Sequence, residues 1–235
     1  MLDPIEAYKI AIQDSYKDSL WWTAKRLCAH SDMTVNTHGS MVRSLESPTK
    51  RKLVCVPRGT YKSSIASVSY AVWLIINNPN IRILIDSEAY SNSKDLLRQV
   101  KYILMSHEFV TRFGDWRTDV WNEGEIIVKP REMNLRSPTI TAGGIETIKV
   151  GQHYDVIIGD DYNSHKNSGT PEQRRKVIDH YQMNQAILDP NGIYAIIGTR
   201  YHEDDLIGWI LRNELGLKGE EDLDSLTSDG GVYEF

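Results

Sequence analysis

The fold of this chain is decided by the stretch Leu53-Val54-Cys55-Val56-Pro57-Arg58-Gly59-Thr60-Tyr61-Lys62-Ser63. Its first four residues form a compact apolar run, which predicts a buried strand, and Pro57 and Gly59 predict a turn directly after it. Beyond Lys62, apolar residues recur at helical spacing until Asn77-Asn78-Pro79 ends the pattern. The sequence therefore predicts a strand, a turn and a helix in succession.

The predicted turn has the composition of a phosphate-binding loop. Such a loop directs backbone amides at phosphate, brings a lysine to the β- and γ-phosphates, and places a Ser or Thr hydroxyl on Mg²⁺ at the start of the following helix. Lys62 and Ser63 fit these two roles. The usual pattern, G-x-x-x-x-G-K-[ST], would require glycine at Val56 and at Tyr61, and neither glycine is present. The alternative is that the Lys-Ser pair only caps or solvates the helix.

Two adjacent carboxylates follow a second apolar strand, in the run Tyr154 to Asp161 that reads Y-D-V-I-I-G-D-D. Ligands of open α/β sheets bind at the carboxyl ends of the strands, where this pair is expected. Asp160 is the candidate Mg²⁺ ligand, and Asp161 is the candidate base that orients or deprotonates the attacking water. Adjacent strand residues point to opposite faces, so the pair shares one site only if the chain turns there. The alternative is a strand that runs into an acidic turn.

The rest of the chain alternates apolar runs with helical patterns, which favours a mainly parallel sheet covered by helices on both faces. We expect helical structure from Pro4 to His30, a polar stretch from Ser31 to Lys52, and short strands or a hairpin between Thr111 and Ser137. Further strands are expected at 81–85, 139–141, 156–158 and 193–197, and further helices at 91–104, 171–188 and 204–215. The expected organisation is an N-terminal helical segment (1–36), a main domain (37–215) and a linker or tail (216–235).

The composition of the chain excludes several classes of protein. A chain of 235 residues with 40% hydrophobic content can bury one sizeable core, and a net charge of −5 excludes a globally basic nucleic-acid binder. Cys28 and Cys55 are too few for a disulfide framework and are expected to be buried free thiols. The start of the chain lacks the features of a secretion signal, and the longest apolar region, Ala71 to Ile76, is too short to cross a bilayer. We therefore expect a soluble, intracellular protein.

Three segments of this sequence resemble the large terminase subunits of tailed bacteriophages. The stretch V-P-R-G-T-Y-K-S-S resembles that family's variant Walker A, in which an arginine four residues before the lysine, here Arg58, is usual. The stretch Y-D-V-I-I-G-D-D-Y is similar to its Walker B with the catalytic acid, although the family often has Glu where this chain has Asp161. The stretch I-I-G-T-R-Y-H-E-D-D-L, from Ile196 to Leu206, is similar to the third motif, which couples nucleotide state to DNA movement.

The resemblance implies a P-loop NTPase of the RecA-like, additional-strand (ASCE) class that hydrolyses ATP with Mg²⁺ and moves double-stranded DNA into a procapsid. It implies partnership with the portal protein and the small terminase subunit, a homo-oligomeric ring on the portal, and a location in the host cytoplasm. The family usually also has a C-terminal nuclease domain, for which we expect no region in this sequence. The resemblance therefore implies either an isolated ATPase domain or a nuclease on another polypeptide. The expected catalytic residues are Asp161, Arg58 and Lys62, and the expected metal ligands are Ser63 and Asp160. The expected nucleotide-binding residues are Arg58, Gly59, Thr60, Tyr61, Lys62, Ser63, Ser64, Thr199 and Arg200.

Several of these residues also have simpler interpretations. Arg58 either stabilises charge on the γ-phosphate or bonds to carboxylates of the sheet, and Arg200 either senses the γ-phosphate or pairs with Asp160 or Asp161. His38 either lines an adenine pocket or lies on the surface. The run from His202 to Asp205 resembles a metal cluster, but Asp204-Asp205 before an apolar helix favours capping. The basic runs 50–52 and 174–176 are either solvated faces or contacts with the DNA backbone.

Two other functions remain open from the sequence. One is another additional-strand ATPase, such as a helicase or DNA-repair translocase, against which the G-T-R-Y-H segment argues. The other is a module that binds nucleotide or partner proteins without turnover, because the turn lacks two glycines.

Overall fold

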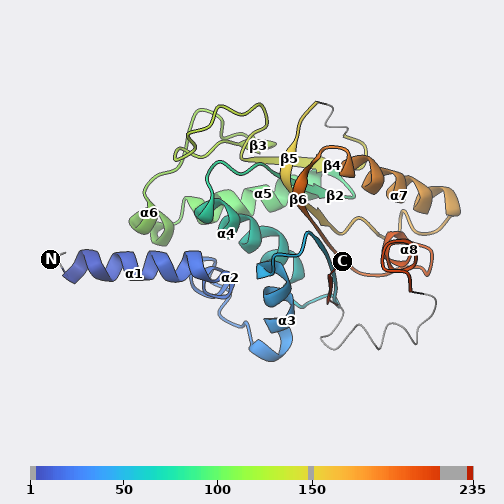
Figure 1. Ribbon diagram of the computed structural model, residues 1–235, viewed down its shortest axis with the longest axis horizontal. Coiled ribbons are helices and arrows are strands. Elements are labelled where there is room, and N and C mark those ends of the chain that lie inside the picture. Colours follow the sequence, from blue (N-terminus) through green and yellow to red (C-terminus); the bar gives the residue numbers. More distant parts are fainter. Residues whose placement is uncertain (1–3, 148–150, 218–231, 235) are drawn as a thin grey trace.

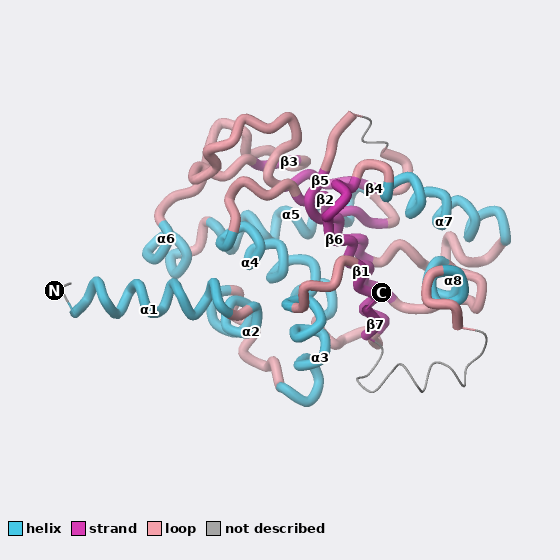
Figure 2. Tube along the Cα trace, viewed as in Figure 1, coloured by secondary structure: helices cyan, strands magenta, loops and turns pink. Residues whose placement is uncertain are grey.

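The computed structural model describes residues 4–147, 151–217 and 232–234, and these residues form an α/β fold around one seven-stranded sheet. The five central strands are parallel, which confirms the mainly parallel sheet expected from the sequence. The two edge strands pair antiparallel with their neighbours. Figure 2 shows most of the strands grouped through the middle of the molecule, with β3 to the upper left of the others. Across the sheet the strands are β3 (Glu125–Ile126), β4 (Ile140–Gly144), β2 (Ile83–Ser87), β5 (Tyr154–Asp160), β6 (Leu188–Gly198), β1 (Arg51–Cys55) and β7 (Val232–Glu234).

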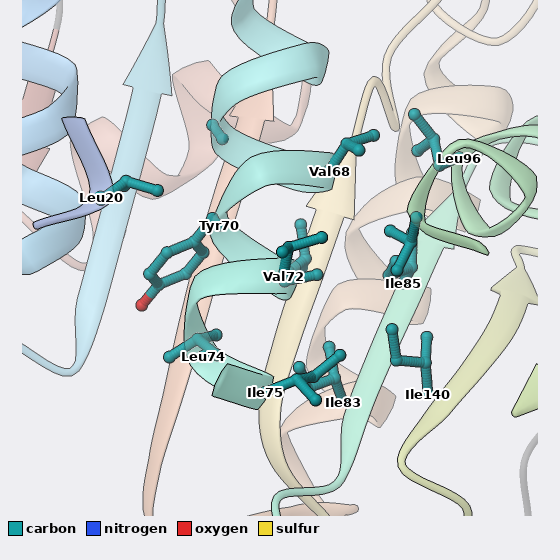
Figure 3. Close-up of a cluster of buried hydrophobic side chains, with 14 of the residues drawn as sticks. Leu20, Val68, Tyr70, Val72, Leu74, Ile75, Ile83, Ile85, Leu96 and Ile140 are labelled. Atoms are coloured by element: carbon teal, nitrogen blue, oxygen red, sulfur yellow. The ribbon is translucent and has the colours of Figure 1, made fainter. Parts of the chain in front are cut away.

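Helices cover both faces of the sheet (Figure 1). One face carries the π-helical segment η2 (Ser64–Ser69), α4 (Tyr70–Asn77) and α5 (Tyr90–Leu104), and the other carries α7 (Pro171–Gln185) and α8 (Leu206–Asn213). Figure 3 shows part of the hydrophobic cluster on the face covered by η2, α4 and α5, where Val68 and Val72 approach Ile83 and Ile85 of β2. Strands β2 and β4 are buried along their whole length, as parallel strands covered on both sides must be.

The N-terminal residues fold as helices, as expected, but in several pieces. They are α1 (Pro4–Asp18), α2 (Leu20–Trp22), the π-helical segment η1 (Thr23–Leu27) and α3 (Val35–Glu46). The buried residues Leu20, Ala24 and Leu27 belong to the same hydrophobic cluster as Ile83 of β2. These helices therefore share the main core, and residues 36 and 37 both lie inside α3.

Three described elements differ from the sequence-based expectation. Helix α3 lies in the stretch 31–52 that was expected only to be polar, and α6 (His107–Phe113) overlaps the region of expected short strands. Part of the expected hairpin is confirmed, because Trp121 pairs antiparallel with Ile126. Residues 232–234 of the expected tail instead form β7, whereas 218–231 lie outside the described residues. Among the described helices, none is long and apolar enough to cross a membrane.

Candidate functional site

The turn between β1 and η2 has the backbone conformation that glycine favours at two positions. Gly59 has φ of 83° and Tyr61 has φ of 53°, both in the left-handed region. Tyr61 stands where the usual pattern has its second glycine, so the non-glycine residue adopts the conformation that a glycine would adopt without strain. The hydroxyl of Thr60 donates to the carbonyl of Pro57 at 2.7 Å, which closes the turn.

Lys62 joins this turn to the ends of two other strands. Its side chain is buried, and Nζ donates to Oδ1 of Asp161 at 2.5 Å and to Oγ1 of Thr199 at 2.9 Å. Asp161 follows the end of β5, and Thr199 follows the end of β6. Three segments that are far apart in the sequence, each expected to carry site residues, therefore meet at one ammonium group.

Asp160 lies beside the start of the helix that follows the turn. Its Oδ2 accepts a hydrogen bond from Ser63 at 3.0 Å, and its Oδ1 accepts one from Ser67 at 2.7 Å. Burial raises the pKa of Asp160 to about 6, and the neighbouring charge of Asp161 adds to this rise, whereas the two hydroxyl groups and Lys62 oppose it. Asp160 therefore gives up its proton at a higher pH than an exposed aspartate does.

The chain turns at Asp161, as the shared-site prediction requires. Asp161 has φ of 47°, and its backbone N–H donates to the carbonyl of Ile197 at 2.8 Å, which fixes the turn to β6. Asp160 therefore faces Ser63, while the next residue, Asp161, faces Lys62. The two carboxylates therefore lie side by side, one against the start of η2 and the other against Lys62.

The two arginines lie outside this cluster. The Arg58 side chain is exposed, with its guanidinium 5.6 Å from the ring centroid of Tyr201 and a hydrogen bond to the Tyr201 hydroxyl. Arg200 is exposed and makes a long contact of 3.5 Å with the carbonyl of Glu203. Within the described part of the chain, neither arginine forms an ion pair with Asp160 or Asp161, so the pairing considered for Arg200 is absent.

Among the described residues, Ser64 forms no hydrogen bond with either carboxylate. Its carbonyl accepts a hydrogen bond from the Ser69 hydroxyl, one turn later in η2, at 2.9 Å. Ser67, which is not among the site residues expected from the sequence, donates to Asp160 instead. Its position in the sequence could have indicated this contact. Ser63 and Ser67 are four residues apart, and such residues lie on one helix face.

His38 is a buried residue of α3, which corrects the surface interpretation. The Tyr61 ring lies near two histidines, with its centroid 6.0 Å from that of His38 and 5.8 Å from that of His30. The Nε2 atoms of both histidines are buried and have no hydrogen-bond partner among the described residues. A group of aromatic rings with unused polar atoms therefore flanks the turn.

The acidic run after β6 caps a helix, as expected. Asp205 is the N-cap of α8, and its Oδ1 accepts a hydrogen bond from the N–H of Gly208 at 3.0 Å. Asp204 pairs with Arg212 at 2.8 Å. In the described ranges there is no group of three or more His, Cys, Asp or Glu residues placed to hold a metal ion. The metal-cluster interpretation of this run therefore has no support.

In the basic runs 50–52 and 174–176, most of the side chains form hydrogen bonds or ion pairs within the protein. Lys52 is buried and donates to the Ser47 carbonyl at 2.9 Å, and Arg174 is buried and donates to the Ser168 carbonyl at 2.8 Å. Arg175 pairs with Asp179 and Lys176 with Glu146. Cys28 and Cys55 are free thiols, as expected, but each keeps part of its surface exposed and neither is fully buried. Partial burial raises the pKa of each thiol.

The donors of the site match a hard divalent cation and a phosphate. The Ser63 hydroxyl and the Asp160 carboxylate supply the oxygen ligands that Mg²⁺ prefers, and Lys62 supplies a positive charge beside them. A second carboxylate, Asp161, is half-exposed and available to water.

Comparison with models of protein families and with curated proteins gave no match for this chain.

Proposed function

We propose that this chain is the ATPase motor domain of a viral DNA-packaging terminase, which hydrolyses ATP with Mg²⁺ to move double-stranded DNA. The observation that carries the proposal is the meeting of Lys62 with Asp161 and of Ser63 with Asp160. In this proposal the four residues serve as the phosphate-binding lysine, the metal-binding hydroxyl and the acidic pair that a P-loop ATPase needs.

Each residue has a definite role in this proposal. Residues 58–63 bind the phosphates, and Lys62 exchanges its contact with Asp161 for the β- and γ-phosphates of ATP. Asp161, released from Lys62, then accepts a proton from the attacking water. Ser63 and Asp160 hold Mg²⁺, which when bound neutralises charge on the phosphates. Ser67 holds the second oxygen of Asp160 in place.

Strand order supports the additional-strand class. Strand β6 lies between β1, which leads into the turn, and β5, which ends in the acidic pair. Each of the three strands contributes to the site, because Thr199 after β6 contacts Lys62. This contact also gives the third terminase-like segment, 196–206, a direct connection to the phosphate-binding lysine.

The biological setting extends the same proposal. We expect double-stranded DNA, the portal protein and the small terminase subunit as partners, a homo-oligomeric ring on the portal, and action in the host cytoplasm. These expectations rest on the three terminase-like segments. Arg58 would act on the γ-phosphate only after leaving Tyr201, either in its own subunit or in a neighbouring one.

Stimulation of hydrolysis separates the terminase from another additional-strand ATPase. The purified chain is assayed alone, with portal-bearing procapsids, with double-stranded DNA and with single-stranded DNA. The terminase proposal predicts stimulation by procapsids with double-stranded DNA. Stimulation by single strands alone would favour a helicase, and tight ATP binding without turnover under every condition would favour the nucleotide-binding module.

A further inference from the structure

A buried polar cluster lies behind the acidic turn, on the sheet face covered by α7. At its centre is Asp86, near the end of β2, whose Oδ2 accepts three hydrogen bonds. The donors are the Tyr162 hydroxyl at 2.8 Å, Nε2 of His180 at 2.6 Å and Nδ2 of Asn184 at 2.7 Å. The other oxygen, Oδ1, is buried and has no hydrogen-bond partner among the described residues. The three bonds to Oδ2 are therefore the contacts that hold this buried carboxyl group, and loss of any one of them is costly.

Tyr162 connects this cluster to the proposed site, because it directly follows Asp161 in the chain. Its ring packs on Gly159, where an added Cβ atom would lie 2.2 Å from the ring. The side chain therefore folds back over the strand that it has just left. Only glycine at position 159 leaves room for this, and the reversal requires the left-handed conformation of Asp161 between them.

The turn sends three successive side chains in three directions. Asp160 faces Ser63 and Ser67, Asp161 faces Lys62, and Tyr162 enters the cluster around Asp86. Hydrogen bonds of the backbone fix only part of the conformation of residues 160–162. The N–H of Asp161 is bonded to β6, and the Tyr162 carbonyl accepts a hydrogen bond from Asn167 at 2.7 Å. The side chain of Tyr162 is the anchor on the far face of the sheet.

We propose that Tyr162, held by Asp86, is a positioning residue that sets the direction of the Asp161 carboxylate. This inference rests on the proposed ATPase function and adds to it a residue that touches neither nucleotide nor metal. Because His180 and Asn184 belong to α7, the same contacts make the direction of Asp161 depend on the placement of that helix. A base that is misplaced by about 1 Å loses about 100-fold in rate.

The test compares two hydroxyl deletions within the same cluster. Tyr162→Phe removes the bond to Asp86. Tyr194→Phe removes a hydroxyl that lies 3.2 Å from the Tyr162 hydroxyl, and leaves the bond between Tyr162 and Asp86 in place. Both variants lose one buried hydroxyl, so a general loss of stability affects both. For each, kcat, KM for ATP, the Kd for ATP and the midpoint of thermal unfolding are measured.

We expect Tyr162→Phe to lower kcat about 10- to 100-fold, with KM and Kd for ATP within about twofold of the wild type. Tyr194→Phe should keep kcat within about twofold, even if its unfolding midpoint falls as far. Asp86→Asn should lower kcat in the same direction as Tyr162→Phe. Equal losses of kcat in the two Phe variants, or an unchanged kcat in Tyr162→Phe, would overturn the positioning role. A wild-type chain that does not hydrolyse ATP would overturn the proposed function itself, and this role with it.

Discussion

Nζ of Lys62 lies 2.5 Å from Oδ1 of Asp161, although 99 positions separate the two residues in the chain. The contact joins the turn after β1 to the turn after β5, across the intervening strand β6. Thr199 from the end of β6 bonds to the same ammonium group. The geometry thus gathers the turns that follow β1, β5 and β6 around one lysine.

Ser67→Ala should affect the metal site, whereas Ser69→Ala should not. Ser67 donates to Oδ1 of the buried Asp160, and its removal leaves that oxygen without its bond, at a cost of about 1–3 kcal/mol of stability. Ser69 is a buried serine in the same segment, but it donates to the Ser64 carbonyl. We expect Ser67→Ala alone to raise the Mg²⁺ concentration needed for half-maximal hydrolysis. Equal Mg²⁺ requirements in the two variants would count against a role for Ser67.

Asp160 should make the folded state less stable as pH rises from about 4 to about 6. Its folded pKa is raised to about 6 from 3.8, so the unfolded chain ionises first and unfolding is favoured within this window. The full difference is about 3 kcal/mol and is constant above the window. Denaturant unfolding in EDTA, compared with Asp160→Asn, isolates this group because Asn does not titrate. Parallel stability curves for the two proteins would show that the pKa of Asp160 is not raised.

Gly159→Ala should destabilise the fold far more than Gly169→Ala. A Cβ atom at position 159 would lie 2.2 Å from the buried Tyr162 ring, and such overpacking costs about 3 kcal/mol. At position 169 the nearest atom is Oε1 of Gln173, at 3.4 Å, which is an ordinary van der Waals contact, so we expect little change there. Thermal unfolding of both variants measures the difference. A Gly159→Ala midpoint within a degree or two of the wild type would mean that Tyr162 does not pack as described.

Arg82→Ala should weaken the sheet without altering nucleotide binding. Arg82 precedes β2 and bonds to both oxygens of Asp155, at 2.6 and 3.0 Å, and also to Asp189. Its removal leaves two facing carboxylates without their cation, at a cost of about 2 kcal/mol. Arg98→Ala, which breaks an exposed pair with Asp95, should cost less than about 1 kcal/mol. Chemical denaturation checks both values, and an unchanged Kd for ATP shows that the site is intact.

Much of the sheet was predictable because its parallel strands are short apolar runs between helical patterns. β1, β2, β5 and β6 each overlap an expected strand, as do α5 and α7 their expected helices. Helix α3 was missed for a physical reason. Its buried face includes His38, Gly39 and Ser44 beside its apolar residues, so the sequence carries no clean apolar stripe.

The candidate site was predictable where a local pattern carries the chemistry. The Lys62-Ser63 pair and the Asp160-Asp161 pair follow apolar strands, and the structure brings all four together. Other parts depend on tertiary contacts. Tyr61 adopts a backbone conformation that its residue type does not indicate, and Asp86 and His180 approach one another from positions 94 residues apart. A cluster of residues so far apart in the chain leaves no local spacing pattern from which it could be predicted.

The most direct test of the central claim is Mg²⁺-dependent ATP hydrolysis by the purified chain, measured beside Lys62→Ala and Asp161→Asn. We predict turnover by the wild type and a loss of at least about 100-fold in each variant, with ATP binding weakened in Lys62→Ala and retained in Asp161→Asn. Turnover that survives in both variants would place the active site elsewhere. Absence of both ATP binding and turnover in the wild type would contradict the phosphate-binding role of the turn.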